Sequence, residues 1–332
     1  MIIKNVRAYY TAGSGPEVKA VDGVSFSVRE GEVLGIVGES GCGKSTLAAV
    51  ISLTARPPLN VKSGEMVLDG ETLSLTEQIK APPDWRGQMV ALLPQRAMNS
   101  LNPTARVRNF VVDVVRAHDA VISPQEAVEQ ARQRLEQLSL PGRVLDSYPH
   151  QLSGGMRQRV IAVISTLLNP KVLVADEPTS ALDVSSQKEL VLLLQLFLER
   201  GFITRIVYIT HDLPMLSNIA DRIAVMYAGE LAEIGTTQEI VDYPQHPYTQ
   251  ALIASTLDPE PRVRGRQIKR IKGVPPDLRY PPSRCRFHPR CPYVMDVCSQ
   301  ETPPIVGEPD RFAACWWVRE QLEKISFKEI KP

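Results

Sequence analysis

A run of glycines and charged residues near the start of the chain has the spacing of a phosphate-binding loop. The segment from Gly38 to Ser45 reads GESGCGKS and fits the pattern G-x-x-x-x-G-K-[ST]. In such a loop the backbone N–H groups converge on phosphate oxygens, because glycine permits the torsions and the close approach. Lys44 would reach the β- and γ-phosphates, and the Ser45 hydroxyl would ligate Mg²⁺. The expected binding residues are Gly38, Ser40, Gly41, Cys42, Gly43, Lys44, Ser45 and Thr46, with Cys42 a small loop residue rather than a redox group.

Two adjacent carboxylates follow an apolar run further along the chain. Val172 to Ala175 read as a buried strand, and Asp176 and Glu177 come directly after it. An isolated acidic pair would be a solvated surface feature. The carboxyl ends of parallel strands instead face a ligand crevice, so we expect Asp176 beside Mg²⁺. Glu177 is then suited to orient or deprotonate the water that attacks the γ-phosphate.

Two further groups have the chemistry of a phosphate site. The apolar run TRIVYIT ends at His211, and a histidine at that strand end could contact the γ-phosphate. Ser153, Gly154 and Gly155 precede a run with apolar residues at helical spacing. A serine followed by two glycines at a helix N-terminus makes a second anion-binding surface.

The elements that must position these residues indicate an α/β fold. Val33 to Val37 read as a buried strand, and a helix begins near Lys44. With 332 residues, of which 43% are hydrophobic, the chain can bury a large core and a smaller appendage. A net charge of +1 gives no reason to expect a nucleic acid partner. No apolar run approaches the roughly 20 residues needed to cross a bilayer, and no signal-peptide pattern opens the chain, so we expect it to stay in the cytoplasm.

Taken together and in order, these motifs resemble the nucleotide-binding subunits of ABC transporters. GESGCGKST, LLPQ, LSGGMRQR, VLVADEP, SALD and THD match the Walker A, Q-loop, signature, Walker B, D-loop and H-loop of that family, over about residues 1–255. The resemblance implies a P-loop ATPase cassette with a RecA-like core, an antiparallel β subdomain and a helical subdomain at about residues 96–165. It also implies ATP and Mg²⁺ as cofactors.

The resemblance assigns further roles residue by residue. Gln95 is similar to the Q-loop glutamine, which contacts Mg²⁺ or water and senses the membrane subunits. The signature residues 153–155 would bind ATP held by the opposite subunit, and Asp183 would communicate across that dimer. Tyr10 resembles the aromatic residue that stacks on adenine, with Tyr9 beside it as the alternative. A complete site would therefore need two cassettes arranged head to tail, with ATP between them.

Three short phrases resemble one branch of importers, those for peptides, nickel and, in some members, oligosaccharides. They are MNSLNP, HPYTQALIAS and IKGVPPDL. The branch implies an ATPase that powers di- or oligopeptide import from the cytoplasmic face of the membrane, with oligosaccharides or nickel as alternative cargo. Its implied partners are a second, related ATPase, two permease subunits and an extracytoplasmic solute-binding protein. The remote alternative, an ABC ATPase that acts on nucleic acid, is disfavoured because the chain has one cassette and no coiled-coil heptads.

Residues 256–332 differ in composition from the preceding part of the chain and contain four of the five cysteines. A polar, proline-rich linker leads to a tail with too few apolar residues for a core of its own. Cys285, Cys291, Cys298 and Cys315 are separated by five, six and sixteen residues, unlike the C-x₂-C pairs of many zinc sites. Four thiolates could bind Zn²⁺ or a [4Fe–4S] cluster, or stay unligated. The tail's resemblance to iron–sulfur-bearing members of the branch favours the cluster.

Overall fold

The computed structural model describes the chain except for residues 12, 14, 77–80, 96–100, 181, 256–270 and 330–332. Two predicted segments lie partly outside the described residues. They are the start of the helical subdomain at residue 96 and the linker that begins at residue 256.

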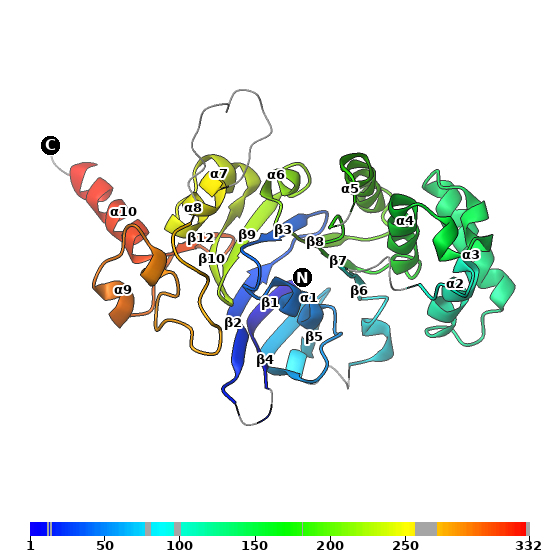
Figure 1. The fold of residues 1–332 in the computed structure, drawn as a ribbon, viewed down its shortest axis with the longest axis horizontal. Coiled ribbons are helices and arrows are strands. Elements are labelled where there is room, and N and C mark those ends of the chain that lie inside the picture. The colour runs from blue at the N-terminus through cyan, green and yellow to red at the C-terminus, as the bar shows by residue number, and fades with distance from the viewer. Residues whose placement is uncertain are drawn as a thin grey trace.

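A mixed sheet of eight strands forms the centre of the molecule, in the order β11-β12-β10-β9-β3-β8-β7-β6. Figure 1 shows the helices arranged around it. Five neighbouring strands are parallel: β9 (Arg222–Tyr227), β3 (Val33–Val37), β8 (Arg205–Ile209), β7 (Val172–Asp176) and β6 (Val90–Leu93). Every residue of β3, β7 and β8 is buried, because a parallel sheet is covered on both faces. This burial explains why these strands read as continuous apolar runs.

A second, antiparallel sheet packs beside the first. Its order is β2-β1-β4-β5, with β1 at Ile2–Tyr10, β2 at Val18–Ser27, β4 at Leu59–Leu68 and β5 at Glu71–Ser74. Helix α1 (Lys44–Ile51) contacts strands of both sheets. Its buried Leu47 and Ile51 share one apolar core with Val6 of β1 and Met66 of β4. A short 3₁₀ turn, η2 (Pro83–Trp85), buries Trp85 in the same core.

Helices make up one end of the molecule, drawn in green in Figure 1. They are α2 (Val107–Arg116), α3 (Pro124–Gln137) and α4 (Gly154–Ser165), with 3₁₀ turns η4 (Gly142–Asp146) and η5 (Pro149–Gln151). A capping box between Ser123 and Glu126 starts α3. Helices α5 (Val184–Glu199) and α6 (Leu213–Leu216) follow β7 and β8 along the chain. Among the described helices, none is long and apolar enough to span a membrane.

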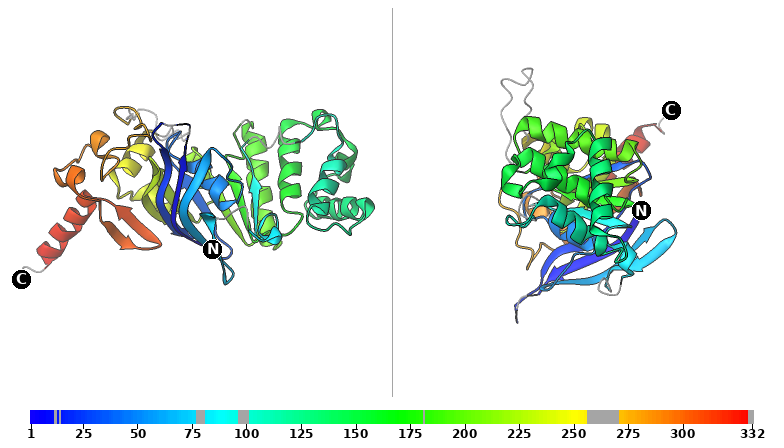
Figure 2. Two further views of the ribbon diagram at one scale, coloured as in Figure 1. Left: turned by 90° about the horizontal axis from the view of Figure 1, so that it is seen from below. Right: turned by 90° about the vertical axis from the view of Figure 1, so that its right-hand side faces the viewer.

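The C-terminal segment lies at the opposite end and continues the central sheet (Figure 2). Strand β12 pairs antiparallel with β10, placing Ala313 opposite Glu233 and Phe312 opposite Ile234. Backbone pairing thus supplies the support that the tail's few apolar residues could not. The elements of this part are β10 (Glu230–Thr236), α7 (Thr237–Asp242), α8 (Pro247–Ser255), η7 (His288–Arg290), α9 (Val297–Gln300), β11 (Ile305–Glu308), β12 (Arg311–Ala314) and α10 (Trp316–Glu329).

The turn between β3 and α1 depends on Gly43, the residue before the helix. Its φ is 108°, in the left-handed region, and a Cβ there would lie 1.9 Å from the carbonyl oxygen of Ala20. Both features exclude any side chain. The loop therefore packs closely against β2, and its backbone conformation is fixed.

Replacing Gly43 by alanine should destabilise the fold more than the same change at a spacious glycine. Gly43→Ala is expected to lower the free energy of unfolding by about 2–5 kcal/mol, from torsional strain together with overpacking. Gly31 is the matched control, since its φ is 78° but a Cβ added there would have no atom within 4 Å. Gly31→Ala should cost only about 1–2 kcal/mol. Equal shifts in urea unfolding of the two variants would contradict this prediction.

Candidate functional site

Four neighbouring parallel strands present the predicted catalytic residues at one edge of the sheet. In the order of the sheet these strands are β3, β8, β7 and β6. The phosphate loop follows β3, His211 follows β8, Asp176 ends β7, and Gln95 comes shortly after β6. The carboxyl ends of parallel strands share one edge, which brings together residues more than a hundred positions apart.

Lys44 and Ser45 lie at the end of the predicted phosphate loop. The Lys44 Nζ donates hydrogen bonds to the carbonyl oxygens of Gly38 at 2.7 Å and Glu39 at 3.1 Å. The Ser45 hydroxyl donates to Asp176 Oδ1 at 3.1 Å. The loop, the first turn of α1 and the end of β7 are thereby joined.

Asp176 is a buried carboxyl group. Burial raises its pKa, and the Ser45 hydrogen bond acts in the opposite direction. The neighbouring charge of Glu177 raises the pKa further, while Lys44 lowers it. A buried carboxylate of this kind would gain from a cation beside it, and a serine hydroxyl with a carboxylate is a ligand set that suits Mg²⁺.

Glu177 is the point at which the three predicted catalytic residues meet. The Gln95 Nε2 donates to Glu177 Oε2 at 2.9 Å, and the His211 Nδ1 lies 3.3 Å from Glu177 Oε1. The backbone N–H of Glu177 donates to the Ile209 carbonyl oxygen at 2.8 Å. Its φ is 44°, an unfavourable torsion for a residue with a side chain. The chain therefore turns sharply after β7, which separates the direction of Glu177 from that of Asp176.

The two tyrosines at the end of β1 have different surroundings. The Tyr10 hydroxyl lies 3.2 Å from the Thr46 hydroxyl, beside the phosphate loop. The Tyr9 hydroxyl donates instead to Asp22 at 2.6 Å, and burial with this contact raises the pKa of Tyr9 to about 12. Of the pair, Tyr10 thus borders the loop. Cys42 is buried, burial raises its pKa, and its N–H donates to the Glu39 carbonyl oxygen at 3.2 Å, which suits a small loop residue.

The signature and D-loop residues form a separate group. Ser153 caps α4 by accepting a hydrogen bond from the Met156 N–H, and Asp183 caps α5 through Ser186. A Cβ on Gly155 would lie 2.5 Å from the Ser186 hydroxyl, so α4 and α5 meet closely there. Within the described residues, no hydrogen bond or ion pair joins this group to Lys44, Ser45 or Glu177. In the described part of one chain, the signature group and the phosphate-loop residues therefore form no shared hydrogen-bonded site.

The four tail cysteines are gathered but do not form a compact ligand set. Among the described residues, no group of three or more His, Cys, Asp or Glu side chains is arranged to hold a metal ion. Burial raises the pKa of Cys285 to about 12, and repulsion from Cys298, Cys315 and Cys291 adds to this shift. The pKa of Cys291 is raised to about 11, also by burial first. The Cys285 N–H donates to the Cys298 carbonyl oxygen at 3.2 Å.

The structure also places residues at the phosphate loop that the sequence motifs do not mark. The Glu39 carboxylate pairs with Arg290 of the tail, and the Glu39 N–H donates to the Tyr248 hydroxyl at 2.9 Å. The sequence signal for this contact was Glu39 itself, because an acidic side chain inside a phosphate loop calls for a cation nearby. The position of that cation, 251 residues away, could not be read from the sequence.

Comparisons with known proteins point to one family. The family described as "ABC transporter" matches residues 21–180, and "Oligopeptide/dipeptide transporter, C-terminal region" matches residues 232–298. The Dipeptide transport ATP-binding protein DppD of Caldanaerobacter subterraneus is 42% identical over 302 residues, covering 91% of each chain. The Oligopeptide transport ATP-binding protein OppD of Bacillus subtilis is 39% identical over 317 residues, covering 94% of this chain and 87% of the relative.

A solved structure shares the cassette fold. It is the dimeric structure of the ATP-binding cassette MJ0796 in a post-hydrolysis state with ADP and Pi, which is 27% identical. The TM-score is 0.59, and the match covers 71% of this chain and 98% of that one. Together with the strand-end site, these similarities show that the chain belongs to the ABC transporter ATP-binding proteins with an oligopeptide/dipeptide-type C-terminal region.

Proposed function

We propose that this ABC ATPase hydrolyses ATP to power import of di- or oligopeptides across a membrane. The observation that carries the ATPase assignment is the convergence of Gln95 and His211 on Glu177, beside the Ser45–Asp176 pair. Peptide cargo is supported by the relatives, whose names refer to dipeptide and oligopeptide transport. Oligosaccharides or nickel are the alternative cargo within the same branch.

The residues of the strand ends divide the work of hydrolysis. Lys44 would leave the loop carbonyls and bind the β- and γ-phosphates. Ser45 and Asp176, with Gln95, would hold Mg²⁺, which supplies charge neutralisation on the phosphates when bound. Glu177 would accept the proton of the attacking water, and His211 would contact the γ-phosphate. Tyr10 would stack on the adenine.

The separate signature group supports a dimer. Ser153, Gly154 and Gly155 would bind ATP held by a second cassette, and Asp183 would lie at that interface. The dimeric form of the 27% identical cassette agrees with such an arrangement. We infer a heterodimer with a related ATPase, seated at the cytoplasmic face of two permease subunits that receive cargo from an extracytoplasmic solute-binding protein. The net charge of +1 offers no support for the alternative of nucleic acid as a partner.

We infer two functional units in the chain. Residues 1–255 would form the ATPase cassette, whose helical subdomain at about residues 96–165 would contact the permease. Residues 256–332 would form a cysteine-containing extension. The pairing of β12 with β10 makes this extension structurally continuous with the cassette.

We also infer that Cys285, Cys291, Cys298 and Cys315 hold a [4Fe–4S] cluster, with Zn²⁺ as the alternative. Buried cysteines that would repel one another as thiolates gain from a cationic centre that compensates their charge. The tail's resemblance to iron–sulfur-bearing members of the branch favours the cluster over Zn²⁺. His288 is not needed as a ligand, and its Nδ1 lies 2.8 Å from the Cys285 carbonyl oxygen.

The catalytic assignment predicts that Glu177→Gln retains ATP binding while turnover falls by about 10²–10⁴-fold, because an amide cannot accept the proton. ATP hydrolysis and equilibrium ATP binding by the purified protein would both be measured. Glu65→Gln is the control, since Glu65 lies in an exposed pair with Lys4 on the antiparallel sheet. Turnover at the wild-type rate in Glu177→Gln would remove Glu177 from its role.

The cluster assignment predicts a brown protein after anaerobic purification, with visible absorbance and about four iron atoms per chain. Cys298→Ser should lose the absorbance and the iron because it removes one ligand. Cys42→Ser should keep both, since Cys42 is buried in the phosphate loop. A colourless wild-type protein that contains zinc and no iron would overturn the cluster.

A further inference from the structure

Arg290 connects the C-terminal tail to the phosphate loop through a two-point ion pair. Its Nη1 donates to Glu39 Oε2 at 2.6 Å, and its Nη2 donates to Glu39 Oε1 at 3.0 Å. The Arg290 side chain is only 6% exposed and that of Glu39 is 21% exposed. A two-point, largely buried pair fixes orientation as well as distance, unlike the flexible pairs of protein surfaces.

Arg290 is held in place independently of Glu39. Its Nε donates to the Lys272 carbonyl oxygen at 2.8 Å, and its Nη1 lies 3.2 Å from the Tyr227 hydroxyl. The guanidinium carbon lies 5.8 Å from the centre of the Tyr227 ring. The guanidinium therefore meets Glu39 already oriented, and little side-chain freedom is lost when the pair forms.

Glu39 in turn organises the loop through its backbone. Its N–H donates to the Tyr248 hydroxyl, while its carbonyl oxygen accepts from Lys44 Nζ at 3.1 Å and from the Cys42 N–H at 3.2 Å. A displacement of Glu39 would thus move the groups that surround the phosphates. The Arg290 side chain, which belongs to the tail, resists this displacement.

The Arg290–Glu39 ion pair also has an electrostatic effect on the phosphate loop. Glu39 lies between Gly38 and Ser40, inside the loop that would receive a polyanion. An uncompensated carboxylate there would repel the phosphates, whereas the Arg290 guanidinium cancels its charge.

We propose that Arg290 is a positioning residue for nucleotide binding, which fixes Glu39 and neutralises it so that the phosphate loop accepts ATP. The inference rests on ATP binding at this loop. Arg290 itself acts only through Glu39. The ATPase thus needs its C-terminal tail for a competent phosphate site, besides any contact that the tail makes with other subunits.

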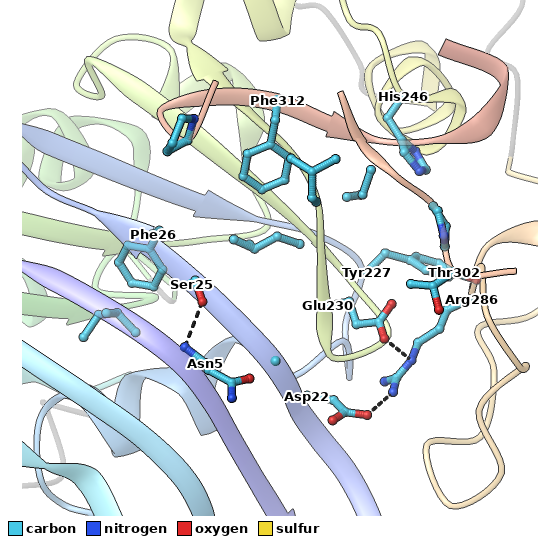
Figure 3. Close-up of a pocket in the computed structure, with 18 of the residues that line it drawn as sticks. Asn5, Asp22, Ser25, Phe26, Tyr227, Glu230, His246, Arg286, Thr302 and Phe312 are labelled. Carbon is cyan, nitrogen blue, oxygen red and sulfur yellow. Dashed lines mark hydrogen bonds and ion pairs between the residues drawn. The ribbon is translucent and has the colours of Figure 1, made fainter. Parts of the chain in front are cut away.

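Other tail side chains attach to the cassette elsewhere. Arg286 forms ion pairs with Asp22 and with Glu230, the latter at 3.0 Å, at one end of a cavity of about 710 Å³ (Figure 3). Arg311 of β12 pairs with Glu239 of α7 at 3.0 Å. Among the contacts of the described residues, Arg311 has none with the phosphate loop, and it therefore provides a control for general loosening of the tail.

The test compares equilibrium binding of Mg²⁺-ATP to the full chain and its variants, together with their thermal unfolding. Arg290→Met should weaken ATP binding about tenfold, as expected for loss of a charged hydrogen-bonded pair. Adding Glu39→Gln to Arg290→Met should restore most of the affinity, because the repulsive carboxylate is gone. Arg290→Lys keeps the charge without the two-point contact and should weaken binding by about threefold. Arg311→Met should bind ATP as the wild type does.

Rescue by the second substitution separates the loss of charge compensation from a loss of stability. If Arg290 were only structural, removing Glu39 as well would leave affinity as low or lower. Unchanged affinity in Arg290→Met and Arg290→Lys, no rescue in the double variant, or an equal loss in Arg311→Met would each overturn the proposal. Should Arg290→Met fail to fold, the comparison of Arg290→Gln with Arg290→Gln/Glu39→Gln carries the same test. Two results would overturn the proposed function as well. One is a wild-type chain that does not bind ATP, and the other is a Lys44→Ala variant that binds ATP as tightly as the wild type does.

Discussion

The parallel pairing of β3, β8 and β7 is the constraint on which the site depends. Register places Asp176 opposite Ile209, and the next residue, Glu177, still donates its N–H to the Ile209 carbonyl oxygen. On the other side of β8, the Thr210 N–H donates to Ile36 of β3. These hydrogen bonds fix the positions along the strands at which His211, Glu177 and the phosphate loop leave the sheet. The positive φ of Glu177 follows, since the chain must turn at once after its last strand hydrogen bond.

The C-terminal tail is bonded to the cassette through buried charge as well as through strand pairing. Arg222 of β9 is buried and pairs with Glu32 at 3.0 Å, while its Nη2 donates to the Asp310 carbonyl oxygen at 2.8 Å. The Asp310 side chain also accepts from Ser27 and pairs with Arg29 at 2.7 Å. Burying a charged side chain costs free energy unless it has hydrogen-bonding or oppositely charged partners. Asp310 of the tail supplies partners that Arg222 would lack in the cassette alone. The sheet and the charged group together make the tail part of the folded cassette.

The local sequence pattern was sufficient to predict the strands and loops that hold the candidate catalytic and binding residues. Val33–Val37 and the start of α1 at Lys44 lie where the apolar run and the glycine spacing predicted them. The meeting of Gln95, Glu177 and His211 agrees with the motif order, because each follows a parallel strand. The addition of β11 and β12 to the sheet could not be predicted, since short strands such as RFAA have weak periodicity and their partner lies some 80 residues away. Long-range ion pairs such as Arg290–Glu39 are likewise absent from any local pattern.

The arrangement of the parts gives the phosphate loop a central place between two ends of the molecule. The helices α2 and α3 lie at one end and the tail lies at the other, with the strand-end site between them (Figures 1 and 2). Helix α4 reaches β6 and α5, on the side of Gln95 and Glu177, whereas the tail reaches Glu39 at the back of the loop. On the proposed function, nucleotide binding would therefore be influenced from two sides. The helical end would act on Gln95, while the Arg290–Glu39 pair would hold the phosphate loop in place.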